Sequence, residues 1–187
     1  MQKLHSTGKV RNIGVSNFGI THLDWLLSSP TCKVSNASRA SYGSYSSALT
    51  DCAQVVPAVN QIELLPKNPS PKLVAYNTSK GIHNTGYSCL GSAGSPLYRN
   101  KTLIDLAESK GKTVQQVVIM WGVQKGWSVI PKSVNPERIS ANFAIDGWEL
   151  TPDEVAIVDA IPERFKVCDG SFLPPEMHGK VFLGDDE

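Results

Sequence analysis

Short apolar stretches alternate with amphipathic helical stretches along this sequence, and the alternation is the feature that most restricts its fold. A helix start signal follows each apolar stretch before the next one begins. Parallel neighbouring strands need crossover connections, usually helices, whereas antiparallel strands can be joined by tight turns. The alternation therefore predicts an α/β fold with a parallel sheet, whose strands we expect at 10–18, 55–65, 83–90 and 127–130.

The helix signals are capping residues and prolines at the expected first turns. Thr113 with Gln116 matches a capping box. In this motif, the side chain of each residue accepts a hydrogen bond from the backbone N–H of the other. Gly8 indicates that residues 1–7 are the end of a helix. The remaining starts are predicted at the caps Thr21, Ser70, Thr102 and Asn135, and at Thr151 with Glu154.

Two folds contain such a sheet, the doubly wound sheet and the eight-unit β/α barrel. A doubly wound nucleotide domain should carry a G-x-G-x-x-G turn after its first strand, and the segment 14–19, GVSNFG, does not match it. The barrel is therefore favoured. In a barrel, functional residues lie at the carboxyl ends of the strands.

Composition excludes two classes of partner. The 18 basic and 17 acidic side chains nearly balance, so no basic patch indicates nucleic acid, and no apolar stretch is long enough for a membrane span. The four cysteines have no metal-ligand spacing, and no secretory signal opens the chain. We expect reduced thiols and a cytoplasmic protein with no metal.

Polar residues follow the predicted strands. The side chains of Ser16 and Asn17 can both donate and accept hydrogen bonds, which suits a planar carboxamide such as that of nicotinamide. Such residues also cap helices. Gln61 follows in the second strand. Tyr87 could support a flat ring or simply fill the core.

The pair Lys132 and Ser133 precedes a predicted helix start with Arg138 in its first turn. Donors and positive charge therefore converge at one helix N-terminus, where a phosphate monoester binds well. An arginine there opposes the helix dipole, and a bound phosphate would reverse the sign of that interaction.

Several segments together resemble the aldo-keto reductases. They are residues 8–18, GKVRNIGVSNF; 59–63, VNQIE; and 130–133, IPKS, followed by Arg138 and Asn142. The resemblance implies an eight-stranded β/α barrel that binds NADPH and transfers hydride reversibly between that cofactor and an aldehyde or ketone. The substrate would be a small carbonyl compound or alcohol.

The resemblance also implies the cofactor contacts. Ser16, Asn17 and Gln61 would hold the carboxamide, and Tyr87 would stack on the nicotinamide ring. Ser88, Leu90 and Ser92 would line the pyrophosphate. The 2′-phosphate and adenine would bind Lys132, Ser133, Arg138 and Asn142, which implies NADP rather than NAD.

The family's proton donor, a Tyr tuned by Lys and Asp beside an orienting His, matches no position of the sequence. About four strand-helix units account for 187 residues, whereas a complete barrel needs about 250 or more. We expect the C-terminal, cofactor-binding half of an NADP-dependent oxidoreductase. The alternative is a non-catalytic, truncated cofactor-binding or interaction protein. The uncovered strands should expose apolar side chains and open edges through which the chain self-associates.

A Ser/Ala-rich insert at 34–54 interrupts this single domain, which spans residues 1–187. It could be a surface loop. Lys33-Val34-Ser35 can be encoded AAG-GTG-AGT, which contains a splice donor, and Ala53-Gln54 can end in an acceptor CAG. Removing residues 34–54 restores ordinary family spacing, so we hypothesise a retained intron.

Overall fold

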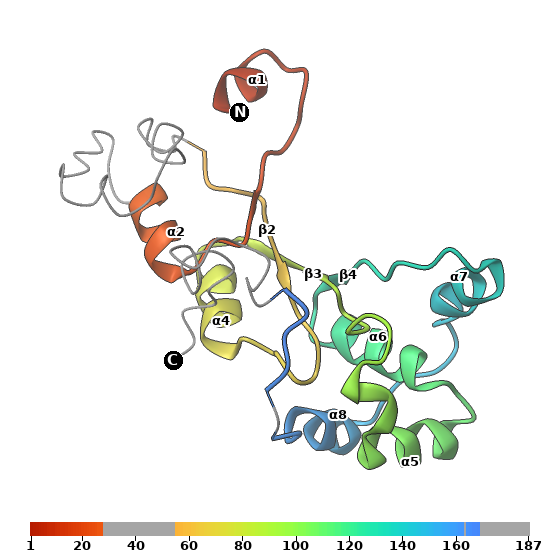
Figure 1. Cartoon of the computed structure of the whole chain (residues 1–187). Helices are drawn as coiled ribbons and strands as arrows, with labels where there is room; N and C mark the ends of the chain where they lie inside the picture. The colour runs from red at the N-terminus through yellow and green to blue at the C-terminus, as the bar shows by residue number, and fades with distance from the viewer. Residues whose placement is uncertain (28–54, 163, 169–187) are drawn as a thin grey trace.

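The centre of the protein is a four-stranded parallel sheet (Figure 1). The structure is a computed structural model and describes residues 1–27, 55–162 and 164–168. The strands lie in the order β1-β2-β3-β4, without the reversal of order that a doubly wound sheet requires. Their bounds are β1 (Val15–Ser16), β2 (Val59–Glu63), β3 (His83–Tyr87) and β4 (Ser128–Val129). The predicted α/β fold with parallel strands is confirmed, and the insert at 34–54 lies outside the described residues.

Helices connect the strands as the alternation predicted. Both capping boxes form, Thr113 with Gln116 and Thr151 with Glu154, and prolines occupy the first turns of the helices after Ser70 and Asn135. The described helices are α1 (Gln2–Ser6), α2 (Ile20–Leu27), α4 (Pro71–Ser79), η2 (Pro96–Arg99, a 3₁₀ helix), α5 (Lys101–Lys110), α6 (Val114–Gln124), α7 (Pro136–Phe143) and α8 (Pro152–Asp159). None of these described helices has the length and apolarity to cross a membrane.

Two predicted caps are wrong. Thr21 lies inside α2, which begins earlier because the N–H of Gly19 donates to Nδ1 of His22 at 3.2 Å. Thr102 lies inside α5. Asn100 caps that helix instead, its Oδ1 accepting the N–H of Leu103 at 3.1 Å, because the preceding 3₁₀ helix ends at Asn100.

All four predicted strands are longer than the observed ones; the strand predicted at 55–65 spans Val59–Glu63, and the one predicted at 127–130 spans Ser128–Val129. The first strand pairs only at Val15 and Ser16, which lie opposite Asn60 and Gln61. The third strand ends at Tyr87 rather than at residue 90, because Ser88 adopts the left-handed region with φ 48° and turns the chain out of the sheet.

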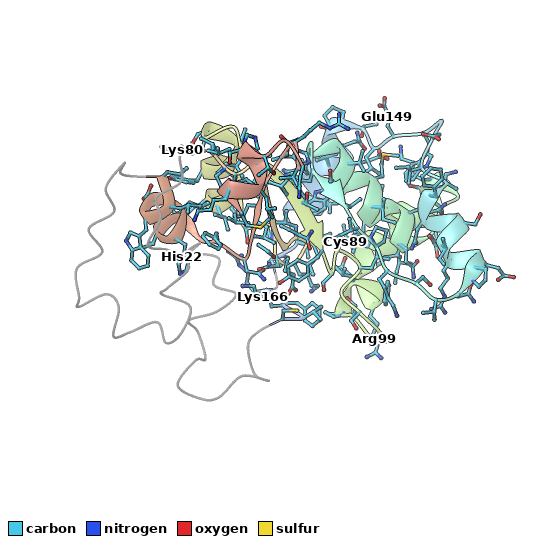
Figure 2. All side chains as sticks on the ribbon, turned by 90° about the horizontal axis from the view of Figure 1, so that it is seen from above. His22, Lys80, Cys89, Arg99, Glu149 and Lys166 are labelled. Carbon is cyan, nitrogen blue, oxygen red and sulfur yellow. The ribbon has the colours of Figure 1, made fainter. Side chains whose placement is uncertain are left out.

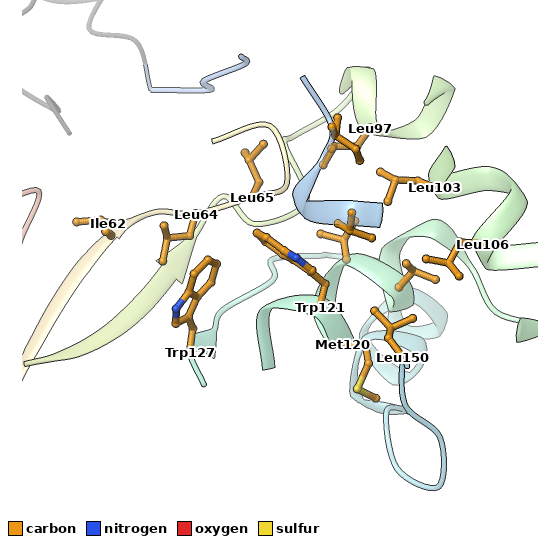
Figure 3. Close-up of a cluster of buried hydrophobic side chains, with 14 of the residues drawn as sticks. Ile62, Leu64, Leu65, Leu97, Leu103, Leu106, Met120, Trp121, Trp127 and Leu150 are labelled. Atoms are coloured by element: carbon orange, nitrogen blue, oxygen red, sulfur yellow. The ribbon is translucent and has the colours of Figure 1, made fainter. Parts of the chain in front are cut away.

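The hydrophobic core lies between the sheet and helices α5, α6 and α8 (Figure 3). Trp121 and Trp127 pack edge to face there, with ring centroids 5.1 Å apart and an interplanar angle of 88°. The indole N–H of Trp121 donates to Asp159 of α8 at 2.8 Å, so this buried polar atom is satisfied. The core therefore fixes the helix layer on one face of β2 and β3.

The opposite face of the sheet is mostly polar. Side chains alternate along a strand, and Asn60 bonds to Asn77 of α4, so its neighbours Gln61 and Glu63 point away from α4. The register adds Ser16, Thr85, Tyr87 and Ser128 to the same face. Most side chains on this face are polar, but apolar ones occur there too: Val59 is half-buried, and Ile130, two residues after Ser128, is 45% exposed. The expectation that the strands expose apolar side chains therefore remains a prediction.

Three of the exposed large apolar side chains lie in or just before α7, a helix at the periphery of the molecule in Figure 1. Val134 and Phe143 are both 83% exposed, and Ile139 is 52% exposed. None of the residues of α7 is buried. The predicted apolar face of this helix therefore exists, but no described residue covers it.

Candidate functional site

The carboxyl ends of β1, β2 and β3 meet around Asn17. Its backbone N–H donates to the carbonyl of Gln61 at 2.9 Å, and its Oδ1 accepts the Tyr87 hydroxyl at 2.9 Å. The hydroxyl of Ser16 also donates to the carbonyl of Gln61, at 2.9 Å. The structure thus brings together the four residues that were predicted from separate strand ends, although residues 17 and 87 are 70 positions apart.

These contacts fix which groups remain for a ligand. Ser16 uses its only proton on Gln61, so its oxygen lone pairs remain as acceptors. Asn17 uses Oδ1 on Tyr87, so the network assigns its Nδ2 group as the donor. An acceptor beside a donor complements a carboxamide, which offers an NH₂ group and a carbonyl oxygen.

Tyr87 keeps its proton at neutral pH. Burial raises the pKa of its phenol, and the nearby Cys168 and Glu63 raise this pKa further, while the hydrogen bond to Asn17 lowers it. The hydroxyl therefore stays a donor to Asn17. The ring is half-buried, which leaves part of the aromatic surface accessible.

A second buried asparagine holds the backbone next to Asn17. The Nδ2 of Asn60 donates to the carbonyl of Phe18 at 2.7 Å, and its Oδ1 accepts the N–H of Phe18 at 3.4 Å. Asn60 is 0% exposed, so both bonds are shielded from water. The sequence pattern did not predict this role of Asn60.

The loop after β3 contains left-handed residues in close succession. Ser88, Gly91 and Ser92 have φ of 48°, 70° and 66°. The N–H of Gly91 donates to the carbonyl of Ser88 at 2.8 Å, and a Cβ at Gly91 would lie 2.2 Å from the Ser95 hydroxyl oxygen. Backbone turns of this kind can direct N–H groups toward an anion.

The loop is fixed from both sides. Tyr98 donates its hydroxyl to the carbonyl of Leu90 at 2.8 Å. Figure 2 labels Cys89 in this loop and Lys166 in the segment that passes it. Phe165 of that segment lies against Gly91, its ring 3.3 Å from where a Cβ would be. The predicted residues Ser88, Leu90 and Ser92 thus share one tightly held turn.

Three of the predicted phosphate residues, Lys132, Ser133 and Arg138, lie at the N-terminal end of α7, whereas Asn142 lies in its last turn. Lys132 and Arg138 are exposed, and Asn142 is half-buried. The hydroxyl oxygen of Ser133 accepts the N–H of Asn135 at 3.1 Å, and Asn135 in turn caps the helix. Burial raises the pKa of Tyr98 and the nearby Arg138 offsets part of that shift, so the charge of Arg138 lies close to the loop after β3.

Glu63 has contacts that sequence reasoning did not predict. Its carboxylate accepts the N–H groups of Val167 at 2.6 Å and Cys168 at 2.8 Å. The signal in the sequence was a carboxylate inside the apolar stretch around Ile62 and Leu64, since such a group needs partners when it is buried. The partners lie more than a hundred residues away.

No group of three or more His, Cys, Asp or Glu side chains in the described part of the chain could hold a metal ion. Burial raises the pKa of Cys89 to about 11, with partial compensation from backbone hydrogen bonds, so this thiol is protonated at neutral pH. The described site therefore has the groups to bind an organic ligand through hydrogen bonds and positive charge.

Comparison with known proteins gives one consistent family. The model of the Aldo/keto reductase family matches residues 1–163. Aldehyde reductase YPR1 of Saccharomyces cerevisiae is 41% identical over 145 residues, which cover 78% of this chain and 40% of that protein.

Two solved structures are similar in fold. One is MGS-M4, an aldo-keto reductase enzyme from a Medee basin deep-sea metagenome library, with a TM-score of 0.74, 28% identity and coverage of 89% of this chain and 53% of that one. The other is a mutant of Gox0644 in complex with NADPH, with a TM-score of 0.67, 31% identity and coverage of 84% and 49%. The chain spans about half the length of these relatives.

Proposed function

Because the chain belongs to the aldo/keto reductase family, we propose that it carries the NADP-binding part of an oxidoreductase that interconverts aldehydes or ketones and alcohols. The observation that carries this proposal is the donor and acceptor pair at Asn17 and Ser16, which complements a carboxamide. When bound, the cofactor supplies or takes up a hydride at its nicotinamide ring.

The residues of this chain fit such a cofactor. Ser16, Asn17 and Gln61 would hold the carboxamide, and the accessible side of the Tyr87 ring would support the nicotinamide. Ser88, Leu90 and Ser92 would lie along the pyrophosphate. The exposed cations, with the helix N-terminus beside them, would bind the 2′-phosphate and adenine through Lys132, Ser133, Arg138 and Asn142.

We propose further that the chain forms one domain, with the insert at 34–54, and supplies four C-terminal units of an eight-unit barrel. The sequential order of the four parallel strands supports this arrangement, since neighbouring units of a barrel follow one another. The reaction is proposed for the whole protein, and cofactor binding is proposed for this chain. The substrate class is a small carbonyl compound.

Binding of NADPH to the purified chain tests this function directly. Asn17→Asp keeps an oxygen for the Tyr87 hydroxyl but removes the Nδ2 donor, and a neutral hydrogen bond contributes about 1 kcal/mol. We expect NADPH affinity, measured by calorimetry, to fall by about fivefold or more. Asn12→Asp, at an exposed position before β1, is the matched control and should leave the affinity unchanged. Failure of the unsubstituted chain to bind NADPH would contradict the proposed function.

A further inference from the structure

Glu63 is a buried carboxylate that the proposed cofactor contacts do not use. Its side chain is 4% exposed and lies at the carboxyl end of β2, on the same face as Gln61. Both carboxylate oxygens accept backbone N–H groups, from Val167 and Cys168. This pair of bonds suits a carboxylate, which accepts hydrogen bonds at both oxygens.

Glu63 lies beside Tyr87, where the nicotinamide ring is proposed to bind. It lies directly opposite Tyr87 in the register of β2 and β3. The pKa of Tyr87 is raised by burial and, in addition, by the negative charge of Glu63, so that charge acts at the phenol. The same phenol bonds to Asn17, the residue proposed to hold the carboxamide. Glu63 therefore lies directly beside Tyr87, the residue proposed to stack on the nicotinamide ring.

The two forms of the cofactor differ in charge at this place. The oxidised nicotinamide ring is a cation, whereas the reduced ring is neutral. A buried carboxylate beside the ring attracts a cation more strongly than the same pair of charges would attract each other in water. Hydrogen bonds from Ser16 and Asn17 to the carboxamide would not distinguish the two forms in this way.

We propose that Glu63 sets the cofactor's redox-state preference, because its buried charge favours binding of NADP⁺ relative to NADPH. This inference rests on the proposed function, since it requires the nicotinamide to lie beside Tyr87. Glu63 acts through its charge in this proposal, separately from its anchoring of residues 167 and 168. The two roles can be tested apart.

The test measures the dissociation constants of NADP⁺ and NADPH for the full chain by calorimetry. Glu63→Gln removes the charge and one of the two N–H acceptors while keeping the side-chain length, and should raise the ratio of the NADP⁺ to the NADPH dissociation constant about tenfold, which equals about 1.4 kcal/mol. Glu63→Asp keeps the charge but withdraws the carboxylate from its N–H partners. This variant should weaken the binding of NADP⁺ and NADPH by similar factors and should change the ratio of their dissociation constants far less.

The control is Asp105→Asn. Asp105 is an exposed carboxylate on α5 that pairs with Lys101, and its loss should leave the ratio unchanged. An unchanged ratio in Glu63→Gln, with both forms still bound, would overturn this inference and leave the proposed function intact. Binding of neither form by the unsubstituted chain would overturn both.

A second measurement does not depend on how well a variant folds. With the unsubstituted chain, the cationic 1-methylnicotinamide and neutral nicotinamide serve as ring probes, and their binding is followed by chemical-shift changes of the tyrosine rings. The cation should bind more tightly than the neutral ring. Equal binding, or tighter binding of the neutral ring, would overturn the inference.

Discussion

Three residues of the candidate site hold a backbone conformation that only glycine adopts freely. Asn17, Ser88 and Ser92 have φ of 57°, 48° and 66°. A non-glycine residue in this region costs on the order of 1–3 kcal/mol and persists only where surrounding contacts impose it. For Asn17 those contacts are visible, since Asn60 clamps the adjoining peptide and Tyr87 holds the side chain. The cost supports a role in ligand binding rather than in stability.

The charge of Arg138 gives the residue-scale prediction. Arg138→Ala should weaken NADPH binding by about 1.5–3 kcal/mol, the contribution of a charged hydrogen-bonding group, and leave NADH binding unchanged because NADH has no 2′-phosphate. Fluorescence titration with both cofactors measures the difference. Arg99→Ala, an exposed arginine of η2, is the control and should affect neither cofactor. Equal losses for NADPH and NADH would contradict the assignment of Arg138 to the phosphate.

At the scale of helices, one side chain joins α6 to α7. Oε1 of Gln116 accepts the N–H of Thr113 at 3.0 Å, while Nε2 donates to the carbonyls of Ala141 and Ala144 at 3.2 and 3.3 Å. The last carbonyls of a helix lack partners within the helix, so these bonds satisfy the end of α7. Because no residue of α7 is buried, its position depends on such polar contacts.

Gln116→Glu separates the two roles. It keeps an acceptor for Thr113 but removes both Nε2 donors and places a carboxylate beside two carbonyl oxygens. We expect the free energy of unfolding to fall by about 1–2 kcal/mol, and the amides of α7 to exchange faster with deuterium. Thr113→Ala, which removes only the cap of α6, should leave amide exchange in α7 unchanged. Equal exchange in α7 for the two variants would show that Gln116 acts on α6 alone.

The capping box of α8 predicts a pH dependence. Burial opposes the charge of Glu154, but Lys110 and the N–H of Thr151 outweigh burial and lower the pKa of this carboxyl below its ordinary value. Its contribution to stability is therefore fully present above the ordinary pKa, near 4.5, and is lost as the pH falls through the lowered value. The free energy of unfolding, measured with urea from about pH 3 to about pH 7, should show this loss. Glu154→Gln should remove that part of the pH dependence of stability. Glu149→Gln, at an exposed position, is the control and should leave this pH dependence of stability in place.

Helix starts could be predicted where the signal was local and complete. The capping boxes at Thr113 and Thr151 carry both halves of the motif within four residues, and both form. Thr21, with Asp24 three residues later, and Thr102 also match a cap, but both helices begin before them. Nδ1 of His22 accepts the N–H of Gly19, and Asn100 caps the helix that contains Thr102. The contact of Glu63 with Cys168 depends on two segments 105 residues apart, which no local pattern encodes.

At the scale of the whole molecule, polarity is distributed unlike that of a barrel with a packed apolar interior. The inner face of the sheet carries mostly polar side chains, of which Ser16 and Ser128 are exposed and Gln61 is half-buried, together with the exposed Ile130. The free edges of the described sheet, β1 and β4, still present backbone donors and acceptors. Association of the chain should therefore involve the sheet edges and the apolar side of α7 rather than the inner face of the strands.

Self-association of the 187-residue chain is the prediction at this scale. Val134, Ile139 and Phe143 are exposed in α7 and in the loop before it, and covering several hundred Å² of apolar surface contributes several kcal/mol at about 25 cal/mol per Å². That is comparable to the 5–15 kcal/mol by which a typical domain is stable. Sedimentation should show dimers or larger species, and Phe143→Lys should shift them toward the monomer. Ile157→Lys, on α8 and 50% exposed, is the matched control and should not. A monomer with a sharp, reversible thermal transition would contradict this prediction, because it would mean that neither the open edges nor α7 need a partner.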